Sequence, residues 1–210
     1  DQAINSSLDL SISLEIILMQ AKEQLKADAA DILLVDEINQ SLFFSKARGF
    51  KTDVVKKTNL RLGTGLPGSA VLERTVVRIP ELQTAEESFF KNALIEQEGF
   101  RSYYCAPLIT KGQLKGVIEV YFRQPFQADQ EWLEFLGTLA QQSAIAINNA
   151  ELLNSLQAGQ FELVNAYENA LQGWVQTYES QLGGEEQLNR LTEFSMQLAE
   201  KMGLNRSDMA

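Results

Sequence analysis

The sequence of 210 residues contains no histidine and only one cysteine, Cys105. Without histidine the chain lacks the commonest metal ligand, the commonest general base and the usual axial ligand of haem. A single cysteine excludes an internal disulfide and a zinc site built from several thiolates. These absences predict a chain with no catalytic residues, no metal site and no cofactor, from a compartment in which thiols stay reduced.

Long apolar runs are also missing, since no stretch approaches the roughly 20 residues that a membrane-spanning helix needs. The first residues lack the basic region of a signal peptide. Acidic residues outnumber basic ones by 28 to 18, which gives a net charge of −10. Such a surface would repel the phosphates of nucleic acids and of anionic lipids. We therefore expect a cytoplasmic protein that binds neither nucleic acid nor membrane, and, because the chain starts without Met, a fragment of a longer one.

The composition is that of an ordinary globular domain, with 45% hydrophobic and 22% charged residues. Apolar residues that recur every three or four positions predict helices, and alternating ones predict strands. Helices are expected over 3–26, 69–74, 86–98, 129–157 and 185–202, with a loosening at Ala158-Gly159. Strands are expected over 32–35, 41–50, 76–79, 101–109 and 114–123. This order predicts an α+β fold in which helices flank an antiparallel sheet, followed by a helical C-terminal extension.

Four segments follow one another at a recognisable spacing. They are Gly63-Thr-Gly65-Leu-Pro67-Gly68 with the Ala70–Leu72 segment after it, Ser102–Leu108 ending in a Pro-Leu pair, Gly116–Val120, and a closing helix over Leu133–Leu152. In this order they resemble the GAF domain family over about residues 8–155. The resemblance implies a GAF-type sheet and a sensory function, since GAF domains bind small molecules, bilins or haem, or only dimerise.

A second resemblance covers about residues 165–210. Trp174, the Gln187-Leu-Asn-Arg190 segment and the Leu198–Leu204 segment resemble the opening of an HD-GYP phosphohydrolase domain. That family usually carries a metal-binding His where this chain has Gln187. We therefore divide the chain into a GAF-like sensory domain, residues 1–158, and a segment resembling a truncated or degenerate HD-GYP domain, residues 159–210.

The glycine-rich segment Gly63-x-Gly65-x-x-Gly68 has the spacing of a dinucleotide-binding fingerprint. That fingerprint requires a buried strand before it and free backbone amides at a helix start. Here the polar segment Lys56–Asn59 precedes it, and Pro67 removes one amide. We therefore interpret the segment as a structural turn.

Cys105 and Glu119 each allow a functional and a structural interpretation. Cys105 could be a redox thiol or a bilin attachment point, but it alternates within an apolar strand and is followed by Ala106 rather than His. We expect it to be a small buried hydrophobe. Glu119 could face a ligand pocket, or could lie on the solvated face of the sheet beside Arg101 or Lys115. For Glu119 we favour the solvated face.

The expected ligand site lies over the sheet, where aromatic residues gather near one cation. Arg101 would suit a carboxylate or a phosphate, because its planar fork can bind either group through two hydrogen bonds. The residues predicted for this site are Phe44, Phe90, Arg101, Tyr104 and Tyr121.

Apolar stripes on helices 3–26 and 129–157 predict a homodimer built from these two helices. Ala140, Ala144, Ala146 and Ala150 would permit a close approach of the helices. The residues predicted for the interface are Leu14, Ile17, Leu136, Leu139, Ala146 and Leu153. A second apolar stripe, which includes Val164, Tyr167, Leu171, Trp174 and Tyr178, continues beyond the expected domain.

The sequence thus predicts a non-catalytic regulatory module that binds an unknown small ligand and signals through dimeric helices to an output domain. Two alternatives stay open. The chain could be the regulatory fragment of a metal phosphohydrolase of the cyclic-di-GMP phosphodiesterase type, or it could be a dimerisation module without a ligand.

Overall fold

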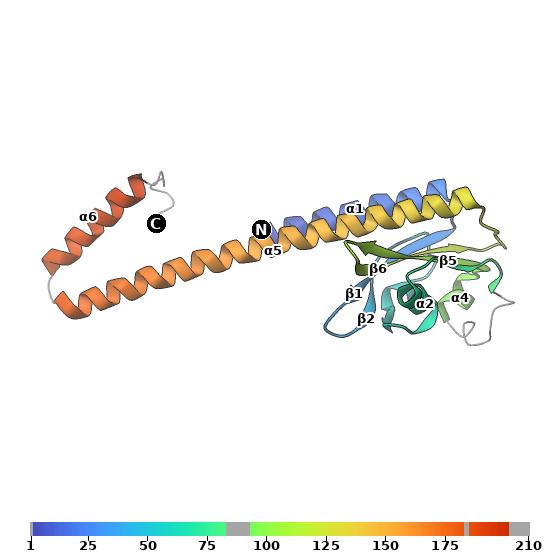
Figure 1. The fold of residues 1–210 in the computed structure, drawn as a ribbon, viewed down its shortest axis with the longest axis horizontal. Helices are drawn as coiled ribbons and strands as arrows, with labels where there is room; N and C mark the ends of the chain where they lie inside the picture. The colour runs from blue at the N-terminus through green and yellow to red at the C-terminus, as the bar shows by residue number, and fades with distance from the viewer. Residues whose placement is uncertain (1, 83–92, 183–184, 202–210) are drawn as a thin grey trace. The chain divides into compact units, whose positions relative to one another are not determined.

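The computed structural model describes residues 2–82, 93–182 and 185–201, in which an antiparallel six-stranded sheet carries helices on both faces (Figure 1). The strand order is β3-β2-β1-β6-β5-β4. The elements are α1 Gln2–Gln24, β1 Ala29–Asp36, β2 Ser41–Arg48, η1 Val54–Lys57, β3 Asn59–Arg61, α2 Gly65–Glu73, β4 Val77–Ile79, α4 Ala93–Glu98, β5 Ser102–Thr110, β6 Gln113–Phe122, α5 Gln130–Leu182 and α6 Glu185–Lys201. The predicted α+β fold with flanking helices is confirmed.

The chain divides into two compact units, residues 1–156 and 157–210. Helix α5 has 53 residues and is not interrupted at Gly159, so the loosening expected at Ala158-Gly159 is wrong. One glycine inside a helix costs only about 1 kcal/mol relative to alanine, which the regular turns on either side can support. The first part of the helix predicted over 86–98 lies outside the described residues. None of the helices described combines the length and the hydropathy that a bilayer-spanning segment requires.

Two apolar cores lie on opposite faces of the sheet, because successive residues of a strand point to opposite sides. Helices α1 and α5 cover one face, and α2 and α4 lie on the other (Figure 1). The helix-side core includes Leu14, Leu18, Leu25, Ile32, Tyr104, Leu108, Ile118, Val120, Leu136, Leu139 and Ile147. The α2-side core includes Ala29, Leu33, Leu42, Val55, Leu66, Ala70, Leu82, Ile95, Phe100, Tyr103, Cys105, Val117 and Tyr121.

The helix-side core corrects the prediction for the dimer interface. Leu14, Ile17, Leu136 and Leu139 are at most 7% exposed and pack against the chain's own sheet. A charge at Leu139 would therefore disrupt the fold rather than separate two chains. Of the remaining two residues, Ala146 is half-buried, and Leu153 is 50% exposed. The helical period was read correctly, but a period does not tell which surface covers the stripe.

Gly116 holds the two central strands in register. It pairs with Leu34 on β1 and with Leu108 on β5. A Cβ atom at this position would lie 2.1 Å from the backbone oxygen of Leu33, so only glycine fits without a shift of the strands. The pairing of β1 with β6 that this contact permits determines which side chains meet on the α2 side.

Candidate functional site

Two acidic residues meet inside the α2-side core. Asp31 on β1 and Glu119 on β6 are directly paired across the two central strands, so both side chains lie on the same face of the sheet. Asp31 is 0% and Glu119 is 4% exposed. The expectation that Glu119 lies on the solvated face is therefore wrong, because the register turns it toward α2. We call Asp31 and Glu119 the acid pair.

The two carboxyl groups differ in their hydrogen bonds. The Tyr103 hydroxyl donates to Oε1 of Glu119 over 2.6 Å, and the Tyr121 hydroxyl also bonds Glu119. Neither carboxylate oxygen of Asp31 has a hydrogen-bond donor within the described part of the chain. A buried carboxylate without a donor costs several kcal/mol. The acid pair is therefore held in a protonated state or completed by a group from outside.

The electrostatics agree with this geometry. Burial raises the pKa of Asp31 well above its ordinary value of 3.8, and the neighbouring Glu119 raises it further. Burial also raises the pKa of Glu119, from 4.5 to about 7, although the hydrogen bonds from Tyr103 and Tyr121 lower it in part. Burial raises the pKa values of both tyrosines well above their ordinary value of 10.0, so they remain donors at neutral pH.

Cys105 lies beside the acid pair, opposite Glu119 on β5. It is fully buried, which confirms the expectation of a small buried residue. Burial, with Glu119 nearby, raises the pKa of the thiol well above its ordinary value of 9.0. The thiol therefore stays protonated and is a poor nucleophile at neutral pH.

The glycine-rich turn leads into α2, which packs on the same face of the sheet as the acid pair. Gly63 and Gly65 both have positive φ angles, of 81° and 69°. A Cβ atom on Gly68 would lie 2.5 Å from the carbonyl carbon of Gly63, so the turn folds back onto the first residues of α2. Strand β3, which precedes the turn, pairs only with β2 at the edge of the sheet. These features support the interpretation as a structural turn, which sets α2 over β5 and β6.

An aromatic wall borders the acid pair. The rings of Phe100 and Tyr121 are stacked with centroids 4.6 Å apart. Phe50 meets both rings edge-on, and Tyr103 lies 5.3 Å from Tyr121. Such pairs contribute about 0.5–1.5 kcal/mol each beyond the burial of their surface. The wall therefore fixes the positions of both tyrosines that donate to Glu119.

Arg123 anchors this wall at its outer end. Its guanidinium lies 5.0 Å from the ring centroid of Phe100 and donates to Oε2 of Glu98 over 2.8 Å. The backbone amides of Lys51 and Thr52 also donate to Glu98, at 2.9 and 2.7 Å. Burial of Glu98 acts to raise its pKa, but these donors outweigh that effect and the net pKa is lowered. This network joins α4, the residue that follows β6 and the segment before η1.

The predicted ligand residues do not gather at one place. Tyr121 is buried in the α2-side core, and the half-buried Phe44 packs against it. Tyr104 lies on the opposite face, where its hydroxyl donates to the carbonyl of Phe126 over 2.7 Å. The fork of Arg101 is occupied by Glu81, at 3.0 and 3.2 Å. Phe90 lies outside the described residues. Tyr104 and Arg101 thus hold the chain's own groups.

Sequence reasoning missed Asp31, Tyr103 and Glu98 as members of the site. Asp31 directly precedes the apolar run Ile32–Val35, so it lies outside the strand predicted over 32–35, although β1 includes it. The available signal was its two-residue spacing from Leu33 on one side and Ala29 on the other, which places it on a buried face.

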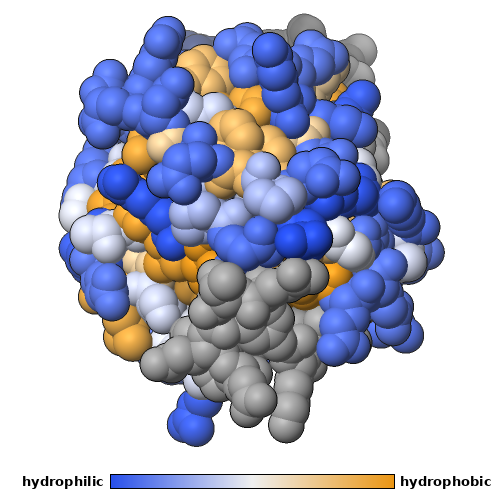
Figure 2. Space-filling view, turned by 90° about the vertical axis from the view of Figure 1, so that its right-hand side faces the viewer, coloured by the Kyte–Doolittle hydropathy of each residue, from blue (hydrophilic) through white to orange (hydrophobic). Residues whose placement is uncertain are grey.

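A separate hollow of about 570 Å³ lies where α1 ends and α5 begins. Leu25, Phe126 and Trp132 are among its lining residues. Figure 2 shows the first unit from this end, where apolar surface is interspersed with hydrophilic side chains. The Trp132 indole donates to the carbonyl of Leu25, and its amide donates to Asp129. These bonds stabilise the start of α5, so we assign the hollow a structural role and not a ligand-binding one.

Comparisons with known proteins identify the fold family. Residues 9–147 match the model of the GAF domain. The GAF domain of an Acinetobacter phosphoenolpyruvate-protein phosphotransferase is 28% identical, with a TM-score of 0.62 over 72% of this chain and 89% of that chain. The GAF domain region of a putative membrane protein from Geobacter sulfurreducens PCA is 25% identical, with a TM-score of 0.61 over 70% of this chain and 99% of that chain.

A GAF domain/HD domain protein from Geobacter sulfurreducens has a TM-score of 0.62 over 72% of this chain and 99% of that chain. At 11% identity this likeness shows the fold alone. No curated protein matches the chain.

The acid pair predicts how stability depends on pH. A carboxyl whose pKa is raised in the folded state binds its proton more tightly there, so its contribution to stability is lost as the pH rises. For Glu119 this contribution is lost as the pH rises from 4.5 to about 7. The free energy of unfolding should therefore decrease by about 3 kcal/mol over this range. Asp31 extends the loss in the same direction. Denaturant unfolding of the ligand-free chain between pH 4.5 and 8 measures this.

Glu119→Gln should flatten the profile over this pH range. The exposed acid Glu73 on α2 supplies the control, and Glu73→Gln should leave the profile unchanged. The lowered pKa of Glu98 has the opposite sign, but its effect is confined to lower pH, as the pH falls below the ordinary value of 4.5. An unchanged slope in Glu119→Gln would contradict the assignment.

Proposed function

The chain belongs to the GAF domain family, and from this premise we propose that it is a regulatory module that binds a small ligand at the acid pair. One observation carries the proposal. Asp31 is completely buried, yet both its carboxylate oxygens lack donors among the described residues. Buried polar groups in folded proteins nearly always have partners. A carboxyl left incomplete in the most central strand pair is best explained by a ligand that supplies the missing hydrogen bonds.

The sheet gives a direct route from the ligand to the helices. On β1, Asp31 faces α2, whereas its neighbours Ala30 and Ile32 pack against the helix-side core. On β6, Glu119 likewise faces α2, whereas its neighbours Ile118 and Val120 pack in the helix-side core. A ligand that shifts either strand would therefore move the packing of α1 and α5. Such coupling needs a ligand that binds two arrangements with different affinity.

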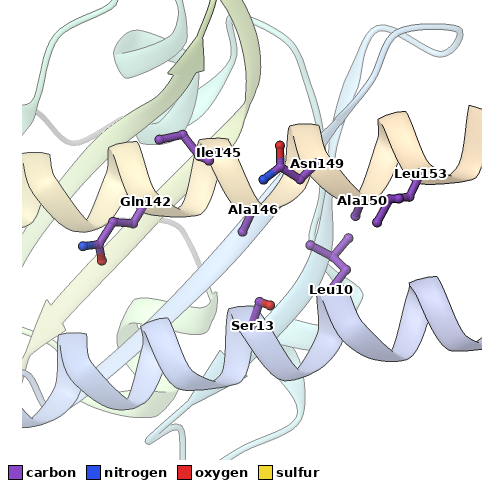
Figure 3. A pocket seen from close by; sticks show the side chains of 8 residues that line it. All are labelled: Leu10, Ser13, Gln142, Ile145, Ala146, Asn149, Ala150 and Leu153. Atoms are coloured by element: carbon purple, nitrogen blue, oxygen red, sulfur yellow. The ribbon is translucent and has the colours of Figure 1, made fainter.

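The same helices offer a surface for a second copy of the chain. A groove of about 390 Å³ runs between α1 and α5 on the outer side of the first unit (Figure 3). Small side chains, among them Ser13, Ala146 and Ala150, lie along it, and none of the described residues that line it is charged. Ile145, which lines the groove, is 45% exposed, and Ile12 and Ile16 on α1 are 57% and 47% exposed. A self-complementary contact across a two-fold axis would cover both helices at once.

In the second unit, α5 carries the predicted second stripe, whose members Val164, Tyr167, Leu171, Trp174 and Tyr178 are exposed. Paired copies of α5 would cover this stripe and form a coiled coil that leads to an output domain. We propose a cytoplasmic homodimer on these grounds.

We also propose that this chain has no catalytic activity of its own. The thiol of Cys105 is buried and protonated, and the sequence contains no histidine to act as a base or as a metal ligand. Two alternatives to this function stay open. The segment around Gln187 and Arg190 resembles the opening of an HD-GYP domain, so the chain could be a regulatory fragment of a metal phosphohydrolase. It could also be a dimerisation module without a ligand. Turnover of cyclic di-GMP with iron or manganese, abolished by a chelator, would favour the enzyme.

The ligand and the dimer can be measured together. Native mass spectrometry of the freshly purified chain should give a dimer with a bound small molecule that is released on denaturation. Asp31→Asn should lose the molecule and remain a dimer, because Asp31 lies on the face of the sheet away from α1 and α5. Glu73→Gln should retain it. A wild-type chain free of any small molecule would favour the ligand-free alternative.

The proposed interface makes a separate prediction. Ile145→Glu places a charge in the lining of the groove without entering the core. The variant should therefore stay folded and sediment as a monomer at tens of micromolar, where we expect the wild type to be a dimer. Ile38 is 93% exposed in the turn between β1 and β2 and belongs to neither helix of the proposed interface. Ile38→Glu makes the same change there and should remain a dimer. A monomeric wild type at this concentration would refute the interface.

A further inference from the structure

The acid pair has a surplus of hydrogen-bond acceptors. Its two carboxyl groups present four oxygen atoms, and the donors that reach them, the hydroxyls of Tyr103 and Tyr121, both bond Glu119. A ligand that completes Asp31 must therefore bring donors. A carboxylate or phosphate ligand has only acceptors to offer when ionised, and it would add a further negative charge to a site whose own two acids already lack a counter-charge.

The cation that had suggested an anionic ligand is not available to one. Arg101 donates two hydrogen bonds to Glu81. It lies directly before β5 and is not among the buried residues of the site. The guanidinium of Arg123 is likewise bound to Glu98 and lies 3.5 Å from Asp28. Neither guanidinium is therefore available to pair with an anionic ligand at the acid pair.

The aromatic rings around the acid pair favour a ligand that carries a positive charge. Tyr121 forms three aromatic contacts within the wall, with Phe100 at 4.6 Å, Tyr103 at 5.3 Å and Phe50 at 5.4 Å. The face of an aromatic ring attracts a cation, most strongly where water is excluded. The apolar residues Leu33, Leu66 and Ala70 of the α2-side core would contact an alkyl body attached to the charge.

A divalent metal fits less well than an organic cation. Within the described residues no group of three or more carboxylate, thiolate or imidazole side chains is arranged to hold a metal ion. Mg²⁺ and Ca²⁺ need six or more oxygen ligands, which one acid pair and two tyrosines do not supply.

We propose that Asp31 and Glu119 bind the positively charged nitrogen of a small organic ammonium ligand, with the ring of Tyr121 against the cation. This inference rests on the proposed function and names the ligand class for that site. The ammonium hydrogens donate to Asp31, whose oxygens then have partners. Because the nitrogen brings its own positive charge, it takes the place of the proton that the ligand-free pair retains. Binding therefore releases a proton and strengthens as the pH rises.

The test is thermal unfolding of the full chain with ammonium, methylammonium and butylammonium chloride at pH 5 and pH 8. Sodium chloride at matched ionic strength and neutral N-methylacetamide are the reference additives. At least one ammonium salt should raise the midpoint at pH 8 by an amount on the order of 5 °C at a hundredfold excess over its dissociation constant. The rise should saturate with concentration and be much smaller at pH 5.

Asp31→Asn should abolish the rise, and Glu119→Gln should reduce it, whereas Glu73→Gln should show the wild-type rise. An equal rise in wild type and Asp31→Asn would overturn the inference. The absence of any rise above sodium chloride would also overturn it. In that case a neutral or anionic molecule found bound by native mass spectrometry would leave the proposed function standing, and no bound molecule would remove both.

Discussion

The pairing of β1 with β6 sets Asp31 opposite Glu119 in the middle of the sheet, where α2 and the aromatic wall exclude water. Two carboxyl groups that are both buried from solvent cannot both be ionised unless a positive charge or several hydrogen-bond donors accompany them. The described donors bond Glu119, and neither carboxylate oxygen of Asp31 receives a hydrogen bond from the described residues. The missing charge is supplied by a proton in the ligand-free chain and, in the complex that we propose, by the cation of the ligand.

A second buried acid in the same molecule makes the contrast clear. The side chain of Glu98 is as inaccessible as that of Asp31, but it receives hydrogen bonds from two backbone amides, one hydroxyl and Arg123. Its pKa is lowered, whereas that of Asp31 is raised. Glu98 thus serves as a permanent structural anchor, and Asp31 has the chemistry of a group that awaits a partner. This difference is the basis of our proposal that a ligand binds at Asp31 and not at Glu98.

The order of strands and helices could be predicted from the sequence because apolar periods of two and of three to four residues report directly on local structure. The site could not be predicted to the same extent. Whether Glu119 faces solvent or the core depends on its partner across the sheet, and Asp31 is distant from it in the sequence. The stripe through Leu136 and Leu139 was equally clear, but its period is the same whether a sheet or a second chain covers it.

Direct observation of the two carboxyl groups would test the account at its centre. Carboxyl ¹³C resonances of the ligand-free chain, assigned with Asp31→Asn and Glu119→Gln, can be followed by NMR as the pH is raised. The account predicts that Glu119 titrates near pH 7 and that Asp31 titrates well above 3.8. Saturating ammonium ligand should lower both midpoints. Two carboxyl groups that titrate as ordinary ones, at a pH of about 4, would contradict the account.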